Sequence, residues 1–168
     1  MKALTIQQPW AAAIAYLGKN VENRDWPCPV ALIGQDVAIH ASAALPSRSG
    51  REMAWAMLAN MAGADAIAAS HLKTWDDLKG GCGHVLAVAT IAGCYSSNGR
   101  FNDERPACPI DDSPWFFGEY GFHLTNVRPL AGQVGPVKGQ LGFWNLPDDI
   151  AAEIRDQLAT MAEIRGAA

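Results

Sequence analysis

The chain has 168 residues, of which 49% are hydrophobic and 18% are charged. This composition excludes a disordered chain and is sufficient for one domain with a hydrophobic core. The net charge of −4 argues against tight, sequence-blind binding to duplex nucleic acid, which needs a basic face, and favours a small pocket.

The first elements are a short strand and a helix. Leu4 and Ile6 alternate with polar residues, which predicts a strand with one apolar face. Pro9 suits the first turn of a helix that continues over residues 11–17. Gly18 suits the left-handed position that ends such a helix.

Two further strands are predicted over residues 20–26 and 36–42, the second from its clear alternation of apolar and polar residues. Residues 46–83 are then expected to form a helical elaboration, which is an addition to the strands of this domain. Ser49 opens a capping box for its first helix, and Thr74 is a candidate cap for a later short helix.

The second half of the chain is expected to contain three strands. Residues 84–94 are apolar on both faces, as in a strand that is covered on both sides. Residues 95–114 form a long polar loop, and loops of that length are usually functional, which makes a lid a candidate role. Strands over residues 121–127 and 137–144 follow, and the last helix begins near Asp148.

About six short strands with inserted helices, and no regular alternation of strand and helix, predict an α+β domain with a mixed, barrel-like sheet. This single domain covers residues 1–168, because no internal repeat or linker is found.

The four cysteines form no CxxC pair. Their spacing lacks the paired ligands of structural zinc sites, so we expect neither a metal nor another cofactor. The chain starts without an apolar leader, and no segment approaches about 18 uninterrupted apolar residues. We therefore expect a cytoplasmic protein with reduced thiols and no membrane partner.

The most informative segment is Lys19-Asn20-Val21-Glu22-Asn23-Arg24. Glu22 and Arg24 are two residues apart, so in a strand they project from the same face. Lys19 lies at the corner between helix and strand, where its long side chain can reach that face. A purely structural strand would carry β-branched or aromatic residues here, so these polar groups indicate a site.

This segment resembles the signature of ASCH domains, a branch of the PUA-like superfamily, usually written G-x-K-x-x-E-x-R. The glycine is displaced by one residue, since Gly18 follows Leu17 at the signature position. Residues 6–11 are similar to the strand-to-helix entry of the family, and residues 136–144 resemble the closing strand of its bacterial and prophage members.

The resemblance implies a small PUA-like mixed β-barrel with flanking helices and a cleft lined by the motif strand. PUA-like domains bind RNA or modified bases. Some small ASCH proteins are metal-free amidohydrolases that remove acyl groups from N4 of cytidine, and others have been reported as ribonucleases. The resemblance therefore leaves open whether this protein is an enzyme or a binder.

Each member of the charged trio has a candidate role. Arg24 can bind a phosphate or a nucleobase carbonyl, and Lys19 can act as a point charge or, with a lowered pKa, as a general base. Glu22 opposes that lowering; alternatively Glu22 is the acid/base and Lys19 stabilises an oxyanion. The small amidohydrolases have a threonine at the position of Glu22, so deacylation does not transfer simply. An exposed ion pair is the structural alternative.

Five other residues are candidates for substrate binding. Gln7 can read a base edge, and Trp10 can stack on a base or pack against the barrel end. His40 is either a proton shuttle in the cleft or a satisfied histidine on a strand face. The aromatic segment over residues 114–121 either walls a flat pocket or closes the core. If it walls a pocket, Glu119 supplies a second carboxylate and Tyr120 a hydroxyl.

The leading hypothesis is recognition of RNA or a modified pyrimidine nucleoside. Lys19 and Arg24 would bind phosphate or carbonyl oxygens, and Glu22 would accept from an exocyclic amine or a ribose hydroxyl. The alternative is hydrolysis of an N4-acylcytidine-type nucleoside, with Lys19 and Glu22 as the catalytic pair. Ribonuclease activity is the third option.

Overall fold

The computed structural model describes residues 1–98 and 108–166. Within this part, one mixed sheet has six strands in the order β2-β5-β4-β3-β1-β6. The predicted α+β class with about six strands is confirmed. The strands are β1 (Lys2–Ile6), β2 (Val21–Arg24), β3 (Asp36–Ala41), β4 (Val85–Ser96), β5 (Tyr120–Val134) and β6 (Phe143–Asn145).

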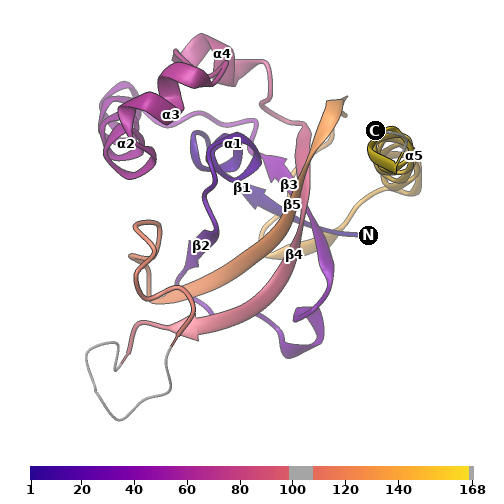
Figure 1. Ribbon diagram of the computed structural model, residues 1–168, viewed down its shortest axis with the longest axis horizontal. Helices are drawn as coiled ribbons and strands as arrows, with labels where there is room; N and C mark the ends of the chain where they lie inside the picture. The colour runs from indigo at the N-terminus through magenta and orange to yellow at the C-terminus, as the bar shows by residue number, and fades with distance from the viewer. Residues whose placement is uncertain (99–107, 167–168) are drawn as a thin grey trace.

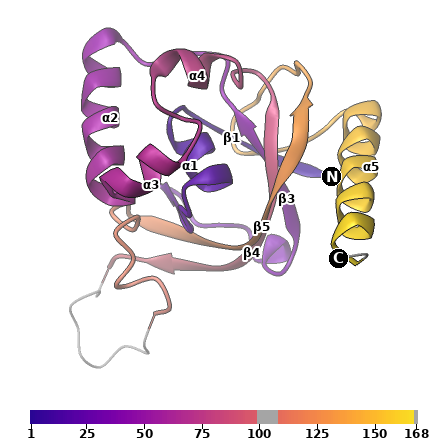
Figure 2. The ribbon, with the colours of Figure 1, turned by 45° about the horizontal axis from the view of Figure 1, so that its top comes forward.

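The sheet curves around one helix and is covered by another on its outer side (Figure 1). The helices are α1 (Trp10–Tyr16), α2 (Arg48–Ala62), α3 (Ala64–Ala69), α4 (Trp75–Lys79) and α5 (Asp148–Gly166), with a 3-10 turn over Val30–Leu32. Figure 2 shows α1 on the concave side, α2 to α4 beyond it, and α5 against the opposite face. None of the helices in the described residues is long and apolar enough to cross a membrane.

Helix α1 is the centre of the concave core. Its residues Ala11–Ala15 are all buried, and small side chains let the helix approach the sheet closely. They pack with Leu4, Ile39 and Phe122. Gly18 has the left-handed backbone (φ 72°) expected after the helix. A second cluster lies between the other face of the sheet and α5, around Val88 and Ile154.

Strand β5 is longer than the predicted 121–127, because it continues to Val134 beside β4. Pro129 and Gly132 argue against a strand there. The pairing of β4 with β5 shifts register at three places, however, and Asn126 adopts a positive φ of 47°. These bulges absorb the irregular residues and bend the ribbon.

Two other predictions are wrong in their bounds. The strand expected over residues 137–144 is only β6, because Gly142 turns the chain in the left-handed region (φ 62°) just before it. The cap of α2 is Ser47, whose Oγ accepts from the Gly50 N–H, instead of Ser49. Thr74 caps α4 as predicted.

The predicted long loop over 95–114 begins later than expected, since β4 extends to Ser96. Residues 99–107, which carry most of the predicted lid, lie outside the described residues. Residues 108–115 form a series of turns that leads to the aromatic segment before β5.

Phe122 holds the curved sheet together. Its ring is fully buried and lies 5.2 Å from the ring of Trp26 and 5.9 Å from that of Phe143. Phe122→Ala should lower the free energy of unfolding by about 3–5 kcal/mol, measured by urea denaturation. Val30→Ala, at a residue that is 85% exposed, should change it by about 0.5 kcal/mol or less. Equal losses in the two variants would contradict this account of the core.

Candidate functional site

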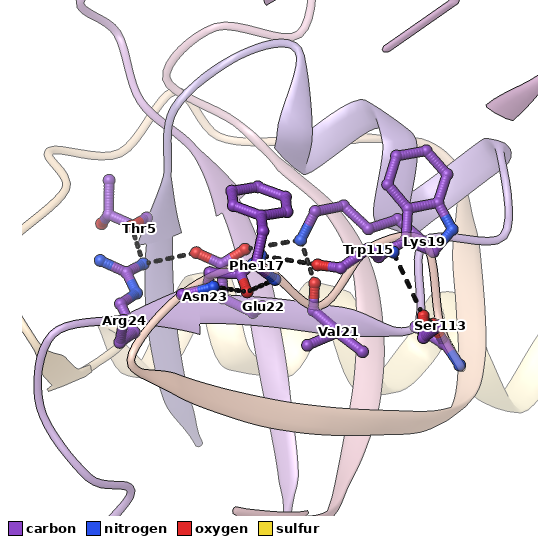
Figure 3. Close-up of polar contacts among 11 residues, drawn as sticks. Thr5, Lys19, Val21, Glu22, Asn23, Arg24, Ser113, Trp115 and Phe117 are labelled. Carbon is purple, nitrogen blue, oxygen red and sulfur yellow. Dashed lines mark hydrogen bonds and ion pairs between the residues drawn. The ribbon is translucent and has the colours of Figure 1, made fainter. Parts of the chain in front are cut away.

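Lys19 is a charged side chain inside the protein. The turn at Gly18 brings it to the start of β2, and its backbone N–H donates to Ala13 O. The side chain is 1% exposed, and its Nζ donates to Val21 O and to Glu22 Oε2, 3.1 Å away (Figure 3). A buried ammonium of this kind is stable only when its donors are satisfied.

Glu22 joins the two cations of the motif. Its Oε1 lies 3.1 Å from Arg24 Nη2, while its Oε2 binds Lys19. The side chain of Glu22 is 8% exposed and that of Arg24 is 22% exposed. The three side chains therefore converge, as Figure 3 shows, and Arg24 is the member that reaches solvent.

Arg24 also bridges the two ends of the curved sheet. Its Nη2 donates to the carbonyl oxygen of Thr5 at 2.9 Å. Thr5 belongs to β1, and β6 pairs with β1 only as far as Leu4, so that edge of Thr5 has no strand partner. The guanidinium thus takes the place of a missing ladder bond. Its Nε is buried and has no hydrogen-bond partner in the described part of the chain.

Opposing effects act on the pKa of Lys19. Burial lowers the pKa of Lys19 from its ordinary value, and the nearby Arg24 charge lowers it further. The charge of Glu22 and its hydrogen bond raise that pKa, and burial is the larger effect. Lys19 is therefore easier to deprotonate than an exposed lysine.

Asn23, which the sequence analysis did not single out, fastens the aromatic segment to the motif strand. Its Nδ2 donates to Trp115 O at 2.8 Å, and its Oδ1 accepts from the N–H groups of Phe117 (3.0 Å) and Gly118 (2.8 Å). A Cβ at Gly118 would lie 2.7 Å from the Cβ of Asn23, so the segment can approach only with glycine there. An asparagine on the opposite face of the strand from the trio is the only sequence signal of this contact.

The aromatic segment divides between core and surface. Trp115 and Phe116 are buried, so they close the core. Phe117 is 51% exposed, and its ring centroid lies 6.3 Å from that of the half-buried Trp10 at an interplanar angle of 58°. The segment therefore closes the core through Trp115 and Phe116, and Phe117 is the ring that stays exposed.

A hollow of about 380 Å³ adjoins the trio, and we call it the Arg24 hollow. Arg24 is the one motif cation or anion that lines it, and Lys19 and Glu22 lie behind. The exposed Glu119 lines the same hollow. The complete lining is Asn23, Arg24, Asp25, Gly118 and Glu119.

Two other predicted residues, Gln7 and Tyr120, lie outside the lining of the Arg24 hollow. Gln7 is exposed, and its backbone carbonyl accepts from the N–H of Trp10 at the start of α1. The buried neighbour Gln8 instead binds Leu78 O and the Ala12 N–H, which is a packing role. Tyr120 lines a larger, mainly apolar hollow of about 510 Å³ with Cys28 and Cys94.

His40 is not brought to the trio. It is fully buried at the end of β3, and its ring packs edge-on against Trp144 at 5.5 Å, on the side of the sheet that faces α5. Its Nε2 lies 3.0 Å from Val137 O. The side chains of β3 alternate between the two faces of the sheet. His40 lies on the face toward α5, whereas a role in the predicted cleft requires the concave face. Over the two described ranges, no group of three His, Cys, Asp or Glu is placed to hold a metal ion.

Glu22→Gln should destabilise the protein, because it leaves the Lys19 ammonium and the Arg24 guanidinium without their shared carboxylate. Removing one partner of a buried ion pair costs about 3–5 kcal/mol, here measured by urea denaturation near neutral pH. The control is Glu52→Gln, in the exposed pair with Arg48, which should cost about 0.5 kcal/mol or less.

The decrease in the free energy of unfolding caused by Glu22→Gln should also become smaller as the pH rises. Without Glu22, burial and Arg24 both lower the pKa of Lys19 in the folded protein. Between that pKa and the ordinary value of about 10.4, the unfolded chain holds more protons, so stability increases with pH. Urea denaturation from about pH 7 to about pH 9.5 measures this. A constant deficit across that range would contradict the assigned electrostatics.

Comparisons with known proteins gave several similar solved structures, of which two come from Zymomonas mobilis. No family model matches the chain, and no curated protein matches it. ASCH from Zymomonas mobilis is 14% identical, with 92% of this chain and 93% of that chain covered and a TM-score of 0.47. A mutant form of ZmASCH from Zymomonas mobilis is 13% identical over 92% of this chain and 94% of that chain, with a TM-score of 0.46. Both are ASCH structures, the family that residues 19–24 resemble.

Proposed function

We propose that this protein recognises RNA or a modified pyrimidine nucleoside in the Arg24 hollow. The observation that carries the proposal is that the Arg24 guanidinium is both fixed by protein contacts and accessible. Glu22 and Thr5 hold its guanidinium in place, yet it is partly exposed and lines a hollow of about 380 Å³. A volume of this size is within the range of small-molecule sites.

The groups around the hollow match a nucleobase. Arg24 offers N–H donors to a ring carbonyl or a phosphate oxygen. The exposed carboxylate of Glu119 can accept from an exocyclic amine, a role expected of Glu22, whose two oxygens are already bound to Lys19 and Arg24. Phe117, which precedes Gly118 of the lining, presents an exposed ring on which a base that extends beyond the hollow can stack.

Arg24→Lys is the variant that tests the proposal. A lysine keeps the charge but lacks the planar fork in which Nη2 binds Glu22 and Thr5 while the other amino group is left for a ligand, so the affinity should fall roughly tenfold or more. Calorimetric titration at low salt with cytidine, N4-acetylcytidine and a short single-stranded RNA measures it.

Two further variants separate binding from folding. Glu119→Gln lies at an exposed position and should weaken binding of ligands with an exocyclic amine. Arg48→Lys, on the surface of α2, should leave binding unchanged. The proposal fails if none of the three ligands binds the wild type, or if Arg24→Lys binds them as tightly as the wild type.

An amidohydrolase is the second candidate, and the lowered pKa of Lys19 favours it. A neutral Lys19 would take a proton from the water that attacks the acyl carbon. The C–N bond would then break, and the proton would pass to the departing N4 amine. Against this, the Lys19 side chain is 1% exposed and its Nζ already donates to Val21 O and Glu22, so substrate recognition at Arg24 is the better supported function.

Hydrolysis of N4-acetylcytidine distinguishes the two. On the recognition proposal, purified protein binds this nucleoside and leaves it intact over a long incubation. An amidohydrolase would release acetate in the presence of EDTA, and Lys19→Ala would reduce the rate by about 100-fold or more. Folding of Lys19→Ala is checked by circular dichroism, so that a loss of activity is not mistaken for a loss of folded structure.

A further inference from the structure

A second hollow of about 380 Å³ lies where β1 and β3 end. These two strands pair in parallel, with Thr5 opposite His40, and ligands of mixed sheets often bind beyond the carboxyl ends of parallel strands. We call it the His40 hollow. The residues of its lining that bear on ligand binding are Thr5, His40, Ser42, Lys138, Gly139 and Gln140.

His40 brings an unused acceptor to this hollow. Burial lowers the pKa of His40, so the ring is neutral near pH 7. Its Nε2 lies 3.0 Å from Val137 O, and a carbonyl accepts only, so Nε2 carries the proton and donates. Nδ1 therefore keeps a lone pair. It is buried and has no hydrogen-bond partner among residues 1–98 and 108–166.

Gly139 lets the chain pass directly over this polar edge. A Cβ at position 139 would lie 2.9 Å from His40 Nδ1, 2.7 Å from His40 Cε1 and 2.8 Å from Thr5 Oγ1. Any other residue would push the segment 137–142 away from the ring. The glycine thus brings backbone atoms, and no side chain, against the two polar groups.

The rest of the lining is rich in donors. Within the described residues, no acceptor takes the backbone N–H groups of residues 138–141. Thr5 Oγ1 accepts from Trp144 Nε1 and Ser42 Oγ accepts from the Ala44 N–H, which leaves both hydroxyl protons to donate. Lys138 is the one charged residue of the lining. Free backbone N–H groups beside an ammonium attract an anion.

We infer that the His40 hollow binds the phosphate group of a nucleotide whose base lies in the Arg24 hollow. Thr5 connects the two places, because its carbonyl oxygen accepts from Arg24 Nη2 and its side chain lines the His40 hollow. A phosphate has several oxygens for these donors, and His40 Nδ1, a neutral acceptor, suits the ribose hydroxyl beside it. This inference rests on the proposed function and makes its ligand a nucleotide or RNA segment instead of a free nucleoside.

Calorimetry with cytidine and with cytidine monophosphate, at equal ionic strength, tests the inference. In the wild type the phosphate should increase the affinity roughly tenfold or more, as expected for charge-assisted hydrogen bonds. Lys138→Gln removes the ammonium of an exposed residue that lines the His40 hollow, so it should reduce this ratio several-fold and leave cytidine binding unchanged. Lys73→Gln, at an exposed lysine before α4, is the control and should keep the wild-type ratio.

Amide chemical shifts on adding inorganic phosphate locate the binding independently. The inference predicts shifts at residues 138–141 in the wild type and smaller ones in Lys138→Gln. Equal affinities for cytidine and its monophosphate, or a ratio that Lys138→Gln does not change, overturn the inference while the proposed function stands. If neither the nucleoside nor the nucleotide binds, the proposed function fails. Amide shift changes at residues 138–141 on adding phosphate would in that case still support the anion site. Without such changes, both the proposed function and the anion site are overturned.

Discussion

The Glu22 carboxylate lies between two cations, 3.1 Å from Lys19 Nζ and 3.1 Å from Arg24 Nη2, and is almost excluded from solvent. Desolvating three charges costs several kcal/mol for each ion in general, so the arrangement persists only because each partner satisfies the others. Two cations share one carboxylate. While Lys19 is protonated the trio is therefore positive, and Arg24 directs that charge toward the hollow it lines.

The same trio depends on the curvature of the sheet. In the strand order, β2 and β1 are separated by three other strands, yet Arg24 reaches Thr5 at 2.9 Å. The bulges between β4 and β5 make this possible, because each shift of register bends the ribbon. A motif on a flat sheet would leave its arginine in solvent. Local sequence and overall bend thus act together to place one guanidinium.

Properties that depend on local spacing were predictable from the sequence. The two-residue interval puts Glu22 and Arg24 on one face, and Gly18 ends α1 with the expected backbone. Contacts between distant segments were not, since Asn23 binds residues more than ninety positions away. For His40, the alternation of β3 identified a face but not which side of the sheet that face meets. Side-chain pattern determines faces, and tertiary packing decides what each face contacts.

The proposed recognition of a ligand at Arg24 depends on preorganisation. Glu22 and the Thr5 carbonyl hold Arg24 before any ligand arrives, which reduces the entropy lost on binding. The group suited to base chemistry, Lys19, is instead held away from the hollow by two acceptors. Asn23 fixes the segment that carries Phe117 and borders Glu119, so the wall of the hollow is rigid as well. On the proposed function, a preorganised Arg24 and the carboxylates of Asp25 and Glu119 around a small hollow serve selective binding, in which Lys19 maintains the geometry of Glu22 and Arg24 supplies the contact.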